Sequence, residues 1–181
     1  DRIGYRGDIA NRPGAIHAYL EPHIEQGAVL EAEGLPIGVV TGIVGLKWMN
    51  ISLRGVQQHA GPSPMRSRRD AMVAAGRIIA GLRDLALEYA DPVVATVGRL
   101  MATPGIVNQI PGQGVLSADL RHWTRDGQEE MGERAVAMIR RIAAEEGVTA
   151  EVDVYWTCPP ISFRSGIVDL IESKVRALGV P

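Results

Sequence analysis

From residue 47 onward, apolar and polar positions follow regular periods that predict a small set of strands and helices. They alternate along residues 47–54, 114–122 and 148–156, a period of two that is typical of strands with one buried face. Residues 93–101 also fit a strand. Apolar residues spaced three and four positions apart predict two helices, each with one buried face. The buried face of the first consists of Ala71, Ala75, Ile78, Leu82, Leu85 and Tyr89, and that of the second consists of Met131, Ala135, Met138, Ile139 and Ile142.

Each of these helices is bounded by residues that favour helix ends. Ser67 to Asp70 has the form of a capping box, which makes Ser67 the expected N-cap of the first helix. A second box begins at Asp126 and opens the second helix. A proline after Asp91 ends the first helix, and Gly147 is a suitable stop for the second.

The order of elements over residues 47–157 is therefore β-α-β-β-α-β. This order predicts an α+β, ferredoxin-like domain, in which two helices cover one face of an antiparallel sheet. The other face, or an edge strand, is left free to meet a partner.

The two ends of the chain do not complete a domain of their own. Residues 20–47 are rich in glycine and short apolar runs, which predict short strands and tight turns, including a strand at Val29 and Leu30. Ser165 is the expected cap of a last helix. Its expected inward side chains are Ile167, Leu170, Ile171, Val175 and Leu178. We expect both ends to belong to one other domain, into which the middle is inserted.

Composition narrows the class of protein. The chain has 181 residues, of which 46% are apolar and 4% aromatic, and its net charge is −2, so it is expected to be a soluble globular protein with an aliphatic core. A near-neutral charge argues against a nucleic-acid partner. No apolar run has the length of a membrane span, so no membrane partner is expected. Cys158 is the single cysteine, which favours a reducing, cytoplasmic location and excludes a cysteine-based metal site.

One candidate for chemistry is His23, which has Glu21 and Glu25 two residues away on either side. On a strand these three side chains share one face, where they suit a metal ligand or a general base. The alternative is an ordinary polar strand end at the surface.

Three further candidates lie in or beside the predicted domain. His59 lies in a loop stiffened by Pro62 and Pro64, which suits a substrate contact or simply an exposed histidine. Asn108 either binds a ligand or caps a turn. Arg121 lies two residues from Asp119 on one strand face, so it either forms a structural pair with that carboxylate or binds an anionic ligand. The arginines at 66, 68 and 69, which follow the His59 loop, either attract phosphate or form a solvated face.

Four stretches together resemble one family. Residues 19–27, read YLEPHIEQG, resemble the HIEQG segment of the amidase branch of the M20 metallopeptidase-like family, which contains N-carbamoyl-L-amino-acid hydrolases, β-ureidopropionases and allantoate amidohydrolases. Residues 59–65 with 68–71 are similar to its HAGxxPM and RRDA segments. Residues 108–112 and 119–122 are similar to its N-x-IPG and D-x-R-H segments.

The resemblance implies an architecture and a chemistry. Residues 43–157 would be a lid that also forms a homodimer, and residues 1–42 and 158–181 would be parts of an α/β metallohydrolase catalytic domain. That domain holds two divalent ions, such as zinc, manganese, nickel or cobalt. The implied reaction is hydrolysis of the C–N bond of N-carbamoyl amino acids or related ureido or amide substrates.

The resemblance also implies roles for individual residues. His23 would be a metal ligand, and His59, Asn108, Arg121 and Gln26 would bind substrate, with Arg121 gripping its carboxylate and His59 acting across the dimer. The general base and the other ligands are expected outside Asp1–Pro181, so no catalytic residue is expected within these residues, which alone would be inactive. Two rival interpretations are a stand-alone, non-catalytic dimerisation or binding module and another M20 branch, such as an aminoacylase or peptidase.

Overall fold

The computed structural model describes residues 14–90 and 92–179, which form two compact units. One consists of Val40–Ile171, and the other consists of residues 14–39 with 172–179. Among the described residues, no helix has the length and apolar character needed to cross a membrane.

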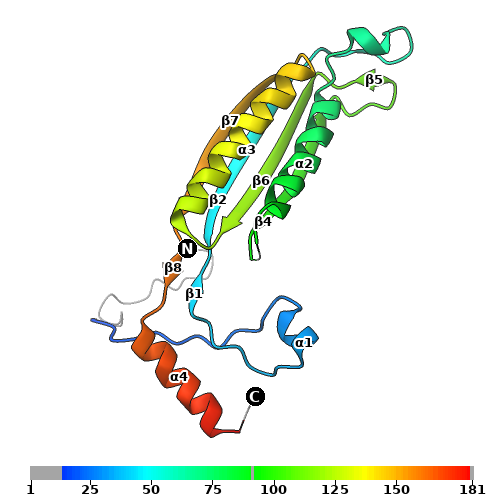
Figure 1. The fold of residues 1–181 in the computed structure, drawn as a ribbon. Helices are drawn as coiled ribbons and strands as arrows, with labels where there is room; N and C mark the ends of the chain where they lie inside the picture. Colours follow the sequence, from blue (N-terminus) through cyan, green and yellow to red (C-terminus); the bar gives the residue numbers. More distant parts are fainter. Residues whose placement is uncertain (1–13, 91, 180–181) are drawn as a thin grey trace, which may run out of the picture. The chain divides into compact units, whose positions relative to one another are not determined.

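The larger unit is built on a four-stranded antiparallel sheet (Figure 1). Its strands are β2 (Gly45–Arg54), β4 (Val94–Thr103), β6 (Gln113–His122) and β7 (Thr149–Cys158). They are arranged in the order β4-β6-β2-β7, with every neighbouring pair antiparallel. The chain passes through them in the predicted β-α-β-β-α-β order, so the ferredoxin-like arrangement is confirmed.

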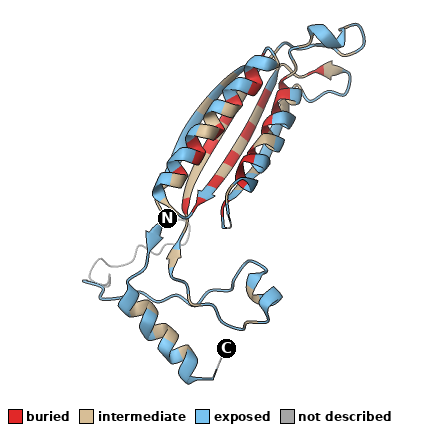
Figure 2. Cartoon of the chain, viewed as in Figure 1, coloured by how far each residue is buried: buried red, intermediate tan, exposed pale blue. Residues whose placement is uncertain are grey.

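Two helices, α2 (Ala71–Leu87) and α3 (Arg125–Glu145), pack against one face of this sheet and against each other (Figure 1). Buried residues lie where the helices face the sheet (Figure 2). The predicted alternation is confirmed for the two central strands, β2 and β6. The buried residues lie only at odd positions in β2 and only at even positions in β6. The largest of the fully buried core side chains are Met49, Ile51, Leu53, Ile78, Leu82, Leu116, Met131 and Ile139.

The predicted caps of both helices are wrong by a few residues. Asp70 caps α2, because its carboxylate accepts from the backbone N–H groups of Met72 and Val73 at 2.9 and 3.4 Å. Ser67 instead ends a short 3-10 turn, Met65–Ser67, and the extended backbone of Arg68 separates that turn from the helix. In α3 the cap is Thr124, whose hydroxyl oxygen accepts from the N–H of Gly127 at 3.1 Å.

Two short ribbons extend from the sheet. At one end β3 (Gln58–His59) pairs with β5 (Gln109–Ile110), and at the other β1 (Gly42–Ile43) pairs with β8 (Ile161–Ser162). The predicted alternation of the last strand fails in its second half. A bulge there sets Trp156 opposite Trp48 and Val154 opposite Met49, and both β7 side chains are exposed.

The strand predicted at Val29 and Leu30 is wrong, because these residues begin the short helix α1 (Val29–Glu33). The carboxylate of Glu25 accepts from both of their backbone N–H groups, and Gly34 ends the helix at a φ of 68°. The last helix, α4 (Ser165–Ala177), begins at Ser165. None of its residues is buried, so its predicted inward face is not enclosed by the described chain.

Candidate functional site

His59 and Asn108, distant in the sequence, lie side by side at one end of the sheet. The β3–β5 pairing sets His59 opposite Gln109, and the backbone N–H of Ala60 donates to the backbone carbonyl of Asn108 at 2.8 Å. The side-chain amides of Gln57 and Gln109 add a hydrogen bond of 2.6 Å across the same ribbon. We call this ribbon, together with the loop of residues 60–70, the tip. The two predicted ligand-binding residues therefore share one surface.

The imidazole of His59 has a defined hydrogen-bonding role. The backbone N–H of Gly61 donates to its Nδ1 at 3.0 Å, so Nδ1 acts as an acceptor. A neutral imidazole that accepts at Nδ1 carries its proton on Nε2. Since His59 is exposed, that Nε2–H is available to donate to a carbonyl oxygen or an oxyanion of a ligand.

Arg121 pairs with Asp119 along strand β6, on the sheet face that no helix covers. Its Nε and Nη2 groups donate to the Asp119 carboxylate at 3.1 and 2.8 Å. These hydrogen bonds raise the pKa of the guanidinium above its usual value, so the group stays charged. They occupy one side of the planar group. Within residues 14–90 and 92–179, the Nη1 end has no protein acceptor, which leaves a two-donor edge for a second carboxylate.

Arg121 does not lie with His59 and Asn108. The β5 segment immediately precedes β6, whereas Arg121 stands near the far end of that strand (Figure 1). Eight residues of extended chain separate Gln113 from Arg121, which corresponds to about 26 Å at roughly 3.3 Å per residue. One ligand the size of an amino acid cannot span that distance. Of the four predicted substrate contacts, the structure therefore joins His59 with Asn108 and separates Arg121 from both.

In the smaller unit, the two carboxylates that flank His23 have other partners. Glu21 accepts from the hydroxyl of Tyr19 at 3.2 Å, and its negative charge raises the pKa of that phenol. Glu25 caps α1. The segment around them forms no strand, so the shared strand face expected of residues 21, 23 and 25 is absent.

The described residues do not by themselves form a metal site. No group of three or more His, Cys, Asp or Glu side chains among them is arranged to hold an ion. His23 is exposed and its Nδ1 contacts the carbonyl of Ile24, which leaves Nε2 as a single open ligand atom. Gln26 is also exposed and adopts a left-handed φ of 55° beside Gly27. A dinuclear centre needs more ligands than this segment contains.

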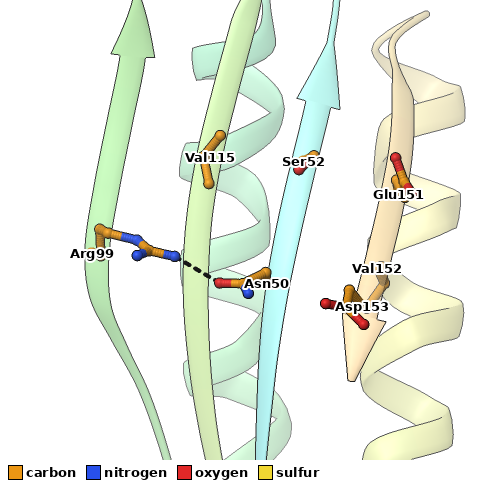
Figure 3. Close-up of a pocket in the computed structure, with 7 residues that line it drawn as sticks. All are labelled: Asn50, Ser52, Arg99, Val115, Glu151, Val152 and Asp153. Atoms are coloured by element: carbon orange, nitrogen blue, oxygen red, sulfur yellow. Dashed lines mark hydrogen bonds between the residues drawn. The ribbon is translucent and has the colours of Figure 1, made fainter. Parts of the chain in front are cut away.

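Sequence reasoning missed a polar hollow on the helix-free face (Figure 3). It has a volume of about 560 Å³ and is lined by Asn50, Ser52, Arg99, Val115, Glu151, Val152 and Asp153. Arg99 donates to the side-chain oxygen of Asn50 at 2.6 Å across β6. The sequence contained most of the polar residues of this hollow at the outward-facing positions of β2 and β7. Their register could not be inferred before the pairing was known.

An aromatic cluster on β2 and β7 was missed for the same reason. The ring centroids of Tyr155 and Trp156 lie 6.2 and 6.3 Å from that of Trp48. On the β6 side of β2, Trp48 is the cross-strand partner of Asp119, so the cluster borders the Asp119–Arg121 pair. The bulge in β7 is what brings two consecutive aromatic residues to this place.

Comparison with known proteins gives a consistent assignment. Residues 41–151 match the M20 family described as a peptidase dimerisation domain. The chain is 37% identical over 163 residues to an N-carbamoyl-L-amino-acid amidohydrolase of Paenarthrobacter aurescens, which covers 90% of this chain and 40% of that protein. It is 36% identical over 157 residues to an allantoate amidohydrolase of Bacillus subtilis, covering 87% and 36%.

A solved structure agrees with these relatives. A hydantoinase/carbamoylase family amidase from Burkholderia ambifaria superposes with a TM-score of 0.86 at 35% identity, over 92% of this chain and 41% of that one. The chain thus spans about 40% of the length of the proteins it matches. Its matched domain, strand order and shared sequence show that this chain belongs to the M20 family, in the hydantoinase/carbamoylase amidase branch.

Proposed function

We propose that this chain is the substrate-binding and dimerising part of a metal-dependent amidohydrolase that hydrolyses the C–N bond of N-carbamoyl amino acids or related ureido or amide substrates. The names of its relatives supply the substrate class. The observation that carries the proposal is the separation along β6 of the tip, with His59 and Asn108, from Arg121. Such a separation suits an active site assembled from two subunits.

In this proposal Arg121 binds the substrate carboxylate. Its Nη1 edge can donate two hydrogen bonds to a carboxylate while the other edge remains with Asp119. The Asp119 pairing also restricts the rotamers of the arginine, which lowers the entropy lost when a ligand binds. Residues 43–157 are the lid that presents this group.

The partner subunit brings the tip to that site. A second copy that pairs with the exposed edge strand β4 by a two-fold axis runs antiparallel to the first. The tip of one lid then lies beside the far end of β6 in the other. Pairing through β4 is favoured over β7, because Arg121 is opposite Val94 on β4 and two strands away from β7. Exposed Leu100 and Met101 on β4 supply apolar area for this contact.

His59 and Asn108 would then act on the carbonyl of the substrate bound by the other subunit. The Nε2–H of His59 donates to the oxygen on which negative charge develops as water adds to the carbonyl carbon. The side-chain amide of Asn108 orients the same group. Hydrolysis of an N-carbamoyl amino acid consumes one water and releases ammonia, carbon dioxide and the free amino acid.

The remaining assignments concern residues 14–39. His23 supplies one metal ligand, and the other ligands and the general base come from the rest of the enzyme. Divalent ions, when bound, generate a hydroxide near neutral pH and polarise the carbonyl. Gln26, beside His23, contacts the substrate. A cytoplasmic location belongs to the same proposal and is supported by the single cysteine, Cys158.

Subunit mixing tests the shared site. His59→Ala and Arg121→Ala variants of the complete enzyme are each expected to be nearly inactive as homodimers. When the two are unfolded and refolded together, about half of the dimers contain one copy of each, and each of these has one intact site. We expect recovery of about a quarter of the wild-type activity on an N-carbamoyl amino acid, since one site in two is intact in half of the dimers.

The outcomes discriminate among the possibilities. If mixing restores no activity, the tip and Arg121 of one subunit act in the same active site, and the proposal of a site shared between subunits is wrong. If neither single variant loses activity, these residues do not bind substrate. If the complete protein hydrolyses no ureido or amide substrate in the presence of divalent ions, the non-catalytic module takes the place of the enzyme.

A further inference from the structure

We infer that Arg68 is the positioning residue of the tip, which holds His59 and Asn108 in the arrangement that the reaction needs. The inference rests on the proposed function and adds to it a residue that does not touch the substrate. The half-buried guanidinium of Arg68 donates from Nη2 to the backbone carbonyl of Ala60 at 2.7 Å and from Nε to that of Ser63 at 3.1 Å. One side chain thus binds both ends of the turn that follows His59.

The peptide groups around Ala60 connect Arg68 to both functional residues. The N–H of Ala60 donates to the carbonyl of Asn108, while its own carbonyl accepts from Arg68. The next N–H, that of Gly61, donates to Nδ1 of His59. A shift of the Ala60 carbonyl therefore moves the Asn108 backbone on one side and the His59 ring on the other.

The chemistry of arginine is needed at this place. Two carbonyl oxygens on one turn are reached together by a planar, rigid set of N–H groups that stays charged at every working pH. A lysine ammonium is a single point charge, so it can hydrogen-bond closely to only one of the two carbonyls. These contacts give Arg68 a role that neither interpretation of the arginine cluster predicted, because its Nε and Nη2 groups donate to carbonyls inside the loop.

Loss of this support has a specific kinetic signature. His59 contacts charge that develops during the reaction, so a misplaced ring weakens the transition state more than the ground state. A displacement of about 1 Å can lower a rate by up to 100-fold. The carboxylate grip of Arg121 lies at the far end of β6 and is untouched. The turnover number is therefore expected to fall while KM stays close to the wild-type value.

The test compares Arg68→Lys and Arg68→Gln in the complete enzyme with Arg66→Gln, a matched exposed arginine of the same loop. We expect kcat to fall about tenfold or more in both Arg68 variants, with KM changed less than about twofold. Arg66→Gln is expected to leave both parameters unchanged. Thermal unfolding controls for loss of fold, and Arg68→Lys remains informative where Arg68→Gln is poorly folded.

A second readout does not depend on activity. In hydrogen exchange of the complete enzyme, Arg68→Lys is expected to accelerate exchange of the Ala60 and Gly61 amides, with the core strands unchanged. Unchanged exchange at both amides together with unchanged kcat overturns the inference.

A double variant tests the positioning role of Arg68 separately from the proposed function. In a His59→Ala background, Arg68→Lys is expected to lower kcat less than it does in the wild type, because only the positioning of Asn108 is left to lose. Additive losses would show a general structural role instead. If His59→Ala itself leaves kcat unchanged, the proposed function fails. If it lowers kcat while well-folded Arg68→Lys is normal, only the positioning inference fails.

Discussion

The side-chain amide of Gln128 donates to the backbone carbonyl of Cys158 at 2.8 Å. The same Nε2 group donates to the carbonyl of Leu46 at 2.9 Å, so one side chain from the start of α3 ties together the beginning of β2 and the end of β7. Gln128 is only 4% exposed. Gly45 allows this approach, because a Cβ there would lie 2.8 Å from the amide nitrogen. The strands that enter and leave the domain are thus held at one point.

Replacing Gln128 by leucine is expected to destabilise the domain. Two part-buried carbonyls lose a side-chain donor, and a buried acceptor left unsatisfied costs up to about 1–3 kcal/mol. Urea unfolding followed by circular dichroism measures the change. Gln113→Leu, at an exposed position of β6, is the matched control and is expected to change stability little. Equal effects of the two variants would contradict the assigned role of Gln128.

The helix caps give a direct comparison between two neighbouring positions. Asp70→Ala is expected to lower the free energy of unfolding by about 1 kcal/mol, because it removes the acceptor for the first N–H groups of α2. Ser67→Ala is expected to have a smaller effect, since its hydroxyl donates only to the Pro64 carbonyl. The reverse order in chemical denaturation would restore Ser67 as the cap.

Acid is expected to weaken the contact between α2 and α3. Hydrogen bonds from Arg77, and next from Arg141, lower the pKa of Glu145 below its ordinary value of 4.5. A carboxylate with a lowered pKa in the folded state stabilises the fold above its ordinary pKa, and this contribution is lost as the pH falls through the folded-state value. Thermal unfolding should therefore separate wild type from Glu145→Gln at pH 7, with the gap closing as the pH falls below 4.5 and through the folded-state pKa. Glu133→Gln, at an exposed position of α3, is the matched control for removal of one carboxylate from this helix, and an equal gap in both variants would contradict the role assigned to the Arg77 contact.

The edge of the sheet that forms the proposed dimer can be identified by charge. Leu100 on β4 and Tyr155 on β7 have nearly equal exposure, 47% and 50%. Leu100→Asp is expected to convert dimers to monomers in sedimentation velocity, because two like charges meet across the two-fold axis. Tyr155→Asp should remain dimeric. The opposite result would assign the interface to β7.

Removal of the Arg121 guanidinium should affect binding of carboxylate substrates. Arg121→Ala in the complete enzyme is expected to raise KM for an N-carbamoyl amino acid by an amount equivalent to about 2–4 kcal/mol. The corresponding substrate amide, which has no carboxylate, should be hydrolysed with nearly the same KM by variant and wild type. An equal loss on both substrates would mean that Arg121 supports the structure rather than the carboxylate.

Periodicity was a reliable guide wherever one face of an element is buried. The alternation around Met49 and Leu116 and the helical spacing around Ile78 each reflect contact with a single core, so the pattern could be interpreted without knowing the partner. It failed at Val29, where a side chain from Glu25 decides between helix and strand. It also failed at Trp156, where a bulge changes the face.

The amino-acid sequence by itself determined the order of elements, the core stripes and the family, because these depend on local periods and on short motifs such as those around His59 and Arg121. Only the tertiary structure decided which of these residues meet. Strand pairing set Ala60 against Asn108, and the length of β6 carried Arg121 away from both. The physical reason is that register and strand length act between segments that are far apart in the chain, where no local pattern records them.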